Sequence, residues 1–238
     1  MKNNTMNKIL IIIPIQNLSA LIRDIVTQLS QVENADMLFI DDGSEDDTFE
    51  QIGEFKQAKC IRHEQFLGYG SCVQSGLKYA SDMEYSFALL IDPKCKKPAQ
   101  NIAAMMDNLN YGYDIVSCSR ILENYDYQSA DSDATEIMTA LSERLKELTA
   151  YDITDPLSGV RAFNIKSIST MDLTDETHGV FLQVYIQGAH FGLDIIEIPL
   201  LSESLPFGSE LALYDDCLGM FLSLMETESF LYKKDSIN

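Results

Sequence analysis

The sequence is poor in basic residues and in histidine. Its 238 residues include 17 Lys and Arg against 37 Asp and Glu, which gives a formal net charge of −20. Such a surface repels nucleic acid and anionic lipid unless basic residues gather locally, so we expect no nucleic-acid partner. With only three histidines and no Cys-x-x-Cys pair, the chain also lacks the usual ligand pattern of a structural zinc site.

Long apolar runs are absent as well. No run approaches the roughly 20 residues that a membrane span needs, and residues 1–8 lack the apolar core of a signal peptide. The five cysteines are scattered and odd in number, which is typical of free thiols in a reducing compartment rather than of a disulfide framework. We therefore predict a cytoplasmic protein with at most a peripheral contact with a membrane.

Apolar periodicity predicts alternating strands and helices in the first half of the chain. The predicted strands cover residues 8–15, 36–40, 58–62, 85–91 and 114–118. The predicted helices between them cover residues 18–29, 49–55, 71–80 and 98–110. This alternation favours an α/β fold with a mostly parallel, doubly wound sheet that is flanked by helices.

The second half of the chain has a less regular pattern. We expect a loop at 123–133, helices at 134–148 and 179–191, a turn-rich segment at 152–163 and a strand at 193–199. We expect residues 211–232 to form an apolar-rich helix whose polar face is acidic. A membrane-surface helix usually carries Lys and Arg on that face, so docking on the core is favoured here.

The most informative segment is MLFIDDGSEDDT, residues 37–48. A buried strand ends on Asp41 and Asp42, a Gly-Ser turn follows, and the Asp46 carboxylate can cap the next helix. Open α/β sheets bind ligands beyond the carboxyl ends of their strands. A solvated turn between strand and helix is the alternative for such a pair of acids.

The pattern Ile-Asp-Asp-Gly-Ser-x-Asp-x-Thr resembles the nucleotide-binding elbow of the family 2 glycosyltransferases, which have the GT-A fold. Further segments resemble motifs of this family in the same order, at 13–17, 67–80, 113–120, 155–163 and 195–200. Within the family, the chain is most similar to the dolichyl- or polyprenyl-phosphate sugar transferases. The resemblance covers roughly residues 8–211, which is most of the chain.

The resemblance implies a GT-A-like domain at 7–211, with a nucleotide-binding half at 7–122 and an acceptor half at 123–211. Residues 212–234 would then form a C-terminal helix packed on it. The implied activity is inverting transfer of a sugar from a nucleotide diphosphate sugar to an acceptor such as a polyprenyl phosphate or a glycan. A lipid phosphate is already ionised near neutral pH, so it needs orientation and charge screening more than a general base.

The family motifs also imply the site residues. The nucleotide-binding set is Pro14, Ile15, Gln16, Asp41, Asp42, Gly70 and Asp92. The acceptor-binding set is Arg120, Ser158 and Arg161. The catalytic set is Asp92, Lys94 and Arg120. Asp92 would also be the ligand of a divalent Mg²⁺ or Mn²⁺ ion that screens the diphosphate as it leaves.

The sequence departs from the family at several of these positions. The Asp-x-Asp motif reads Asp92-Pro93-Lys94, so the second carboxylate is missing and the metal site should be severely weakened. Leu18 stands where the family has a Glu after the first strand. Gln183 stands where the family has the acid of a Phe-Gln-x-Glu segment. Residues 205–211 lack the basic side chains that the family has there.

Two hypotheses follow. In the first, the protein is a transferase in which Lys94, with Lys96 and Lys97 nearby, screens the diphosphate in place of a metal. In the second, it is a catalytically inactive pseudo-glycosyltransferase that binds a nucleotide, a nucleotide sugar or a partner protein. Simpler alternatives are that the lysines face solvent, and that Arg120 and Arg161 are surface or ion-paired arginines.

Overall fold

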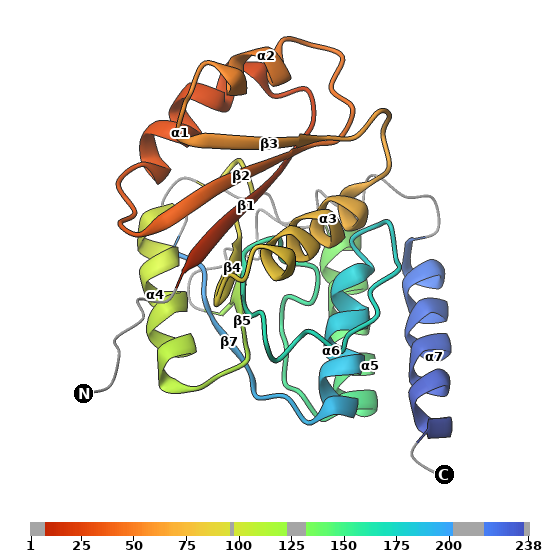
Figure 1. Ribbon diagram of the computed structural model, residues 1–238. Helices are drawn as coiled ribbons and strands as arrows, with labels where there is room; N and C mark the ends of the chain where they lie inside the picture. Colours follow the sequence, from red (N-terminus) through yellow and green to blue (C-terminus); the bar gives the residue numbers. More distant parts are fainter. Residues whose placement is uncertain (1–7, 96–97, 123–131, 202–216, 236–238) are drawn as a thin grey trace, which may run out of the picture.

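The computed structural model describes residues 8–95, 98–122, 132–201 and 217–235. Within them, a seven-stranded sheet runs in the order β3-β2-β1-β4-β6-β5-β7 (Figure 1). The strands are β1 (Ile9–Ile15), β2 (Ala35–Asp41), β3 (Ala58–Arg62), β4 (Phe87–Leu90), β5 (Ile115–Ser119), β6 (Arg161–Asn164) and β7 (Ile195–Pro199). All neighbouring strands pair in parallel except where β6 lies between β4 and β5. The mostly parallel α/β sheet is thus confirmed.

Strand β6 corrects one sequence expectation. The segment 152–163 was expected to be turn-rich, but its last residues begin a strand that pairs antiparallel with both β4 and β5. The strand has only four residues and starts on a buried arginine, so it shows no apolar alternation. Long-range pairing with strands on both sides, rather than a local pattern, makes it a strand.

Helices cover both faces of the sheet. They are α1 (Ile22–Leu29), α2 (Thr48–Gly53), α3 (Tyr69–Asp82), α4 (Pro98–Tyr111), α5 (Ser132–Thr149), α6 (Val180–Phe191) and α7 (Cys217–Asp235). A short 3₁₀ turn, Ser19–Leu21, precedes α1. Helices α1, α2 and α4 pack on one face, and α3 and α6 pack on the other. Helices α5 and α7 pack against α6 on its outer side (Figure 1).

The β-branched run of β1 lies between β2 and β4 and is buried on both faces, because helices cover both sides of the sheet there. Ile11 and Ile13 belong to the core under α1 and α4, whereas Leu10 and Ile12 belong to the core under α3 and α6. Close packing of α3 on β1 depends on Gly76. A Cβ atom at that position would lie 2.5 Å from Cγ2 of Ile12.

Helix α7 docks on the domain through an apolar and a polar contact. Phe221 and Met225 are fully buried in the cluster with α5 and α6. Beside them, the buried Glu228 carboxylate accepts hydrogen bonds from the side-chain amides of Gln183 (3.0 Å) and Gln187 (2.6 Å) on α6. The predicted domain boundaries after residues 122 and 211, and most of the predicted loop at 123–133, lie outside the described residues.

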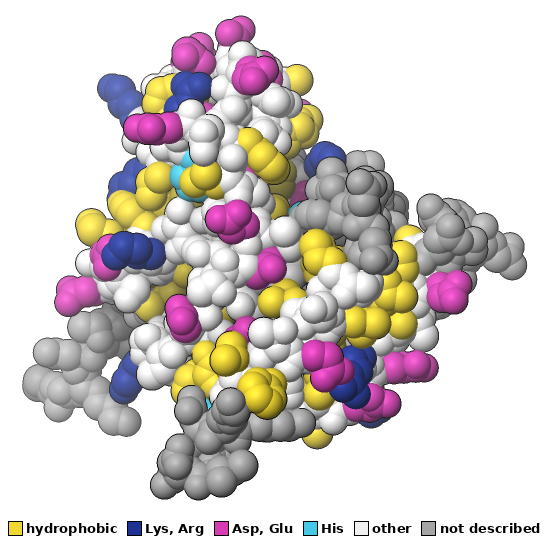
Figure 2. All heavy atoms as spheres, turned by 90° about the vertical axis from the view of Figure 1, so that its right-hand side faces the viewer, with side chains coloured by type: hydrophobic (Ala, Val, Ile, Leu, Met, Phe, Trp, Pro, Cys, Tyr) yellow, Lys and Arg dark blue, Asp and Glu magenta, His cyan; other side chains and the backbone are white. Residues whose placement is uncertain are grey.

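The outer face of α7 carries exposed apolar residues, among them Phe230 and Leu231. Figure 2 shows the face that carries this helix, with apolar side chains beside scattered acidic ones and no broad basic patch. Among the described helices, none combines the length and the apolar character that crossing a bilayer demands.

Candidate functional site

The carboxyl ends of four strands, β1, β2, β4 and β5, open onto one cavity of about 580 Å³. From β1 the strands β2 and β3 follow one another toward one edge of the sheet, whereas β4 lies on the other side of β1. The strand order therefore reverses between β1 and β4. A crevice at such a switch point is where open α/β sheets bind their ligands. Its volume lies within the range of about 300–1,000 Å³ that small-molecule sites occupy.

The structure brings most of the predicted site residues to this cavity. Those that line it are Pro14, Ile15, Gln16, Asp42, Asp92, Lys94 and Arg120. The predicted residues that do not line it are Asp41, Gly70, Ser158 and Arg161. Leu18, which stands where the family has an acid, lines the cavity as an apolar residue.

The turn after β2 is tied to the turn after β1. Ser44 Oγ accepts a hydrogen bond from the Asn17 N–H (2.9 Å), and Thr48 Oγ1 accepts one from the Leu18 N–H (2.9 Å). Asp46 accepts from the N–H (3.0 Å) and the hydroxyl of Thr48 and from the N–H of Ser19 (3.2 Å). The hydrogen bonds of Thr48 and Ser19, the Thr48 hydroxyl first, lower the Asp46 pKa to about 2. Asp46 therefore binds the first residue of α2, although it lies one residue before the N-cap position. The Ser, Asp and Thr of the motif thus act as structural links between loops.

Asp41 lies behind the cavity wall. It is fully buried, its Oδ1 accepts a hydrogen bond from the Ser44 N–H (3.1 Å), and its Oδ2 lies 3.3 Å from Nε of Arg62. Its place follows from strand geometry, because successive side chains point to opposite sides of a strand. Only the next residue, Asp42, turns to the cavity.

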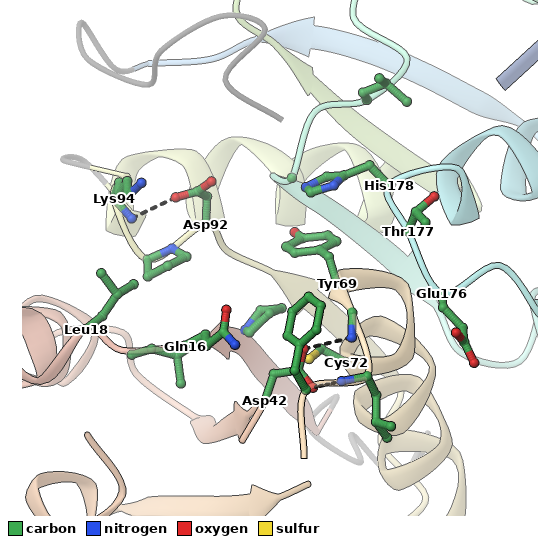
Figure 3. A pocket seen from close by; sticks show the side chains of 18 of the residues that line it. Gln16, Leu18, Asp42, Tyr69, Cys72, Asp92, Lys94, Glu176, Thr177 and His178 are labelled. Atoms are coloured by element: carbon green, nitrogen blue, oxygen red, sulfur yellow. Dashed lines mark hydrogen bonds between the residues drawn. The ribbon is translucent and has the colours of Figure 1, made fainter. Parts of the chain in front are cut away.

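Asp42 organises the glycine-rich segment before α3. Its Oδ1 accepts from the Leu67 N–H (3.0 Å) and lies 2.7 Å from His63 Nδ1, and its Oδ2 accepts from the Gly68 N–H (2.9 Å) (Figure 3). Gly68 has φ of +102°, a conformation that side chains disfavour. One carboxylate therefore holds the loop that forms one wall of the cavity.

Asp42, His63 and Cys72 lie close enough together to be considered as a metal site, with ligand atoms within 4.8 Å of one another. Their polar atoms are already engaged, in part with one another, because Asp42 Oδ1 lies 2.7 Å from His63 Nδ1. Both Asp42 oxygens are engaged, and the second ring nitrogen of His63 is 3.0 Å from Ser75 Oγ. Burial also raises the pKa of the Cys72 thiol, which keeps it protonated. The group is a hydrogen-bond network of the cavity wall.

Asp92 and Lys94 form a tight turn directly after β4. The Lys94 N–H donates to Asp92 Oδ1 (2.7 Å), and both residues line the cavity (Figure 3). Burial raises the pKa of Asp92, although the hydrogen bond from Lys94 and the charges of Lys94 and Arg120 oppose the shift. Lys96 and Lys97 lie outside the described residues.

Arg120 is an ion-paired arginine at the end of β5. Its Nε and Nη2 donate to the two oxygens of Asp155 (2.6 and 2.7 Å), and its backbone N–H donates to the same carboxylate (3.0 Å). The pair is almost closed to solvent, with side chains 8% and 0% exposed. Asp155 is fixed in turn by Glu197 of β7, which accepts from the Asp155 N–H (2.9 Å) and whose pKa is raised by burial.

Arg161 and Ser158 lie beneath the loop that follows Asp155. The Arg161 guanidinium is fully buried and donates to the backbone carbonyls of Ser158 (2.9 Å) and Pro156 (2.6 Å). It also lies over the rings of Phe181 (4.0 Å) and Tyr185 (4.8 Å) on α6. In this structure both residues shape the loop, and neither side chain faces the cavity.

Gly70 and Gln183, two positions in family-like segments, contact the segment before α6 and do not line the cavity. The Gly70 N–H donates to the Glu176 carbonyl (2.8 Å), and a Cβ at Gly70 would collide with the backbone of 175–177. The helix that was predicted at 71–80 begins two residues earlier, at Tyr69. Gln183 is buried, and its side-chain oxygen accepts from the Thr174 and Asp175 N–H groups (2.9 Å each).

Tyr69 and His178 are cavity residues that the sequence did not reveal. Their rings stack with centroids 4.2 Å apart, and they face Asp92 across the cavity (Figure 3). Burial, with the nearby charge of Arg120, lowers the pKa of His178 to about 3, so its imidazole is neutral. Gly159 leaves room for the Tyr69 side chain, because a Cβ atom at residue 159 would lie 2.8 Å from the Tyr69 hydroxyl. The only sequence signal was the position of Tyr69 between two glycines.

Comparison with known proteins gives consistent matches. A family model described as glycosyl transferase family 2 matches residues 10–169. The UDP-N-acetylglucosamine–dolichyl-phosphate N-acetylglucosaminyltransferase of Methanococcus voltae is 24% identical over 211 residues, covering 81% of this chain and 84% of the relative. A dolichyl-phosphate hexose transferase of Haloferax volcanii is 29% identical over 162 residues, covering 67% of this chain and 66% of the relative.

A solved structure is similar over nearly the whole chain. It is glucosyl-3-phosphoglycerate synthase from Mycobacterium tuberculosis, in complex with Mn²⁺, UDP-glucose and phosphoglyceric acid. The TM-score is 0.70 at 17% sequence identity, and the likeness covers 95% of this chain and 81% of that one. At this level of identity, the likeness shows a shared fold.

Proposed function

The chain belongs to glycosyl transferase family 2, and we propose that it transfers a sugar from a nucleoside diphosphate sugar to a phosphate-bearing acceptor of the polyprenyl-phosphate type. Family and fold likeness together confirm the GT-A fold and the glycosyltransferase class that the sequence indicated. The relatives are named as transferases, which does not favour the inactive alternative. The donor, the acceptor and the residue roles that follow are our proposal.

The observation that carries the proposal is the meeting of four strand ends at one cavity. Gln16 and Asp42, from the first two strand ends, would lie along the nucleoside. Asp92 and Lys94 from β4 would lie at the diphosphate, and Arg120 from β5 would border the acceptor side. This division places the groups in the order nucleoside, diphosphate and acceptor along one crevice.

The acceptor class is supported by the names of the relatives. Both relatives cited above are named for dolichyl phosphate. A phosphate monoester needs no general base, because it is ionised near neutral pH.

The reaction then proceeds by a single displacement at the anomeric carbon. An acceptor phosphate oxygen forms a bond to that carbon as the bond to the donor's diphosphate oxygen breaks. The leaving nucleoside diphosphate takes the bonding electron pair, so negative charge grows on its terminal phosphate. The residues of the cavity need to align the two phosphates and to screen that charge.

A divalent metal is the usual means of screening, and the solved structure described above contains Mn²⁺. The residues at this strand end do not fit such an ion well. Among the described residues, the turn after β4 offers one carboxylate, that of Asp92. One of its oxygens accepts the Lys94 N–H, and the position of a second carboxylate carries a lysine. We therefore derive no step through a metal.

The proposal is tested by binding and by transfer. Titration calorimetry with UDP and GDP measures nucleotide binding. Radiolabelled UDP- and GDP-sugars with polyprenyl phosphate in detergent micelles then report labelled lipid and released nucleoside diphosphate. We expect binding and transfer with one of the nucleotides. Folded protein that binds neither nucleotide would refute the proposal, and binding without transfer to lipid or glycan acceptors would support the inactive alternative.

An isosteric variant locates the chemistry. Asp92→Asn removes the charge of a cavity carboxylate, so we expect it to lower the transfer rate. Because burial already raises the pKa of Asp92, an uncharged amide of the same shape should leave thermal stability close to the wild type. Asp152→Asn is the matched control, because Asp152 is exposed and pairs with Lys146 away from the cavity. Equal transfer rates in the two variants would contradict the assigned site.

A further inference from the structure

We propose that Lys94 takes the place of a divalent cation at the diphosphate, so that this protein binds its donor without metal. The inference rests on the proposed function, since it assigns the group that neutralises the donor within the same cavity. It concerns the chemistry of one position, where a carboxylate that would hold a metal is replaced by an ammonium.

The turn after β4 places this ammonium at the cavity. The Lys94 N–H bonds to Asp92 Oδ1 at 2.7 Å, and this bond fixes the backbone from which the lysine side chain starts. Lys94 is exposed and lines the cavity together with Asp92. A lysine side chain offers a compact charge with three donors on a flexible stem, which suits a phosphate group.

Among the described residues that line the cavity, Lys94 is the cation that can receive a new anion. Arg120 is already committed, because its guanidinium and its backbone N–H all donate to Asp155. Lys94, by contrast, takes part in no ion pair within the part of the chain that the structure describes. Asp42, Asp92 and Glu176 also line the cavity, so a diphosphate entering it needs a positive partner.

The same arrangement disfavours a bound divalent ion. Mg²⁺ is normally held by one or two carboxylates together with substrate phosphates. At this strand end it would find one carboxylate and would face the like charge of the Lys94 ammonium. Replacing the lysine by aspartate restores two carboxylates and removes that repulsion, which makes the position a switch between the two modes of binding.

The test compares nucleotide affinity with and without metal. Titration calorimetry with UDP and GDP is carried out in EDTA and in MnCl₂, on the wild type and on Lys94→Asp. We expect wild-type affinity to change by no more than about twofold between the two conditions. In EDTA, Lys94→Asp should bind about ten- to hundredfold more weakly, the range for loss of a charge-assisted hydrogen bond, and it should recover in Mn²⁺.

Lys166→Asp is the matched control, with the same charge change at an exposed lysine that does not line the cavity. It should bind like the wild type in both conditions, and thermal denaturation checks that each variant is folded. Wild-type binding that EDTA abolishes would overturn the role of Lys94 and leave the proposed function standing. Lys94→Asp that binds in EDTA as tightly as the wild type would also overturn it. Absence of nucleotide binding in either condition would overturn the proposed function itself.

Discussion

The buried Arg120–Asp155 ion pair gives the clearest prediction about the stability of the protein around the site. We expect Asp155→Asn to destabilise the protein strongly, because it leaves the Arg120 charge buried without its partner. The side chains are 8% and 0% exposed, and removing one member of a buried pair typically costs about 3–5 kcal/mol. A protein of this size loses about 2–4 °C in Tm for each kcal/mol, so Tm should fall by about 6–20 °C.

Equilibrium unfolding in urea measures this cost, with Arg120→Met and the double variant completing a double-mutant cycle. Each single variant leaves one uncompensated buried charge, whereas the double variant leaves none. We therefore expect the double variant to be less destabilised than the sum of the two single variants. The control is Lys78→Met, which breaks an exposed pair with Asp82 that is worth about 0.3–0.5 kcal/mol. A cost for Asp155→Asn no larger than that of the control would refute the reasoning.

Three further predictions concern packing, titration and helix docking. Gly76→Ala should cost about 1–3 kcal/mol in urea unfolding, because its Cβ would lie 2.5 Å from Ile12 Cγ2. The unfolded chain protonates His178 near pH 6.5, but the folded protein does so only near pH 3. Unfolding free energy should therefore fall as pH drops from 6.5, by at most about 1.4 kcal/mol per pH unit from this group, and His178→Phe should flatten that slope. Glu228→Leu should cost about 1–3 kcal/mol by leaving the α6 amides short of an acceptor.

Each of these predictions has a control and a contrary outcome. Gly53→Ala places its Cβ in open space and should not destabilise, so equal costs at Gly53 and Gly76 would contradict the packing argument. An unchanged pH slope in His178→Phe would show that other groups cause it. Glu226→Leu, at an exposed position on the same helix as Glu228, should have the smaller effect of the two. A larger effect at Glu226 would contradict the docking of α7 through the buried carboxylate.

The elements that local patterns encode were predictable. The apolar run of β1 identifies a strand buried on both faces, and helical periodicity identifies α1. Motif order along the chain also indicated which strand ends meet, and Asp42, Asp92 and Arg120 do line one cavity. The elements were readable because a strand buried on both faces is a continuous apolar run, whereas a helix buried on one face has apolar residues at helical spacing.

The sequence pattern did not show which motif residues line the cavity and which hold the surrounding loops in place. Asp41 and Asp42 are adjacent and chemically identical, yet one is sealed behind the wall and the other faces the cavity. Arg161 reads as an acceptor-binding cation, yet it is buried against backbone carbonyls and aromatic rings. Strand alternation sets the two aspartates apart, but the side that carries the cavity and the rings that cover Arg161 come from segments that are remote in the sequence.

Strand order and strand direction in the sheet also depend on contacts between segments that are distant in the sequence. Strand β6 exists because β4 and β5 supply hydrogen bonds on both sides, and the Tyr69–His178 stack exists because α3 and α6 cover the same face. A local pattern records how much of a segment is buried, but it does not record what buries it. The amino-acid sequence therefore specified the elements and their family, whereas packing between remote segments decided which side chains the cavity receives.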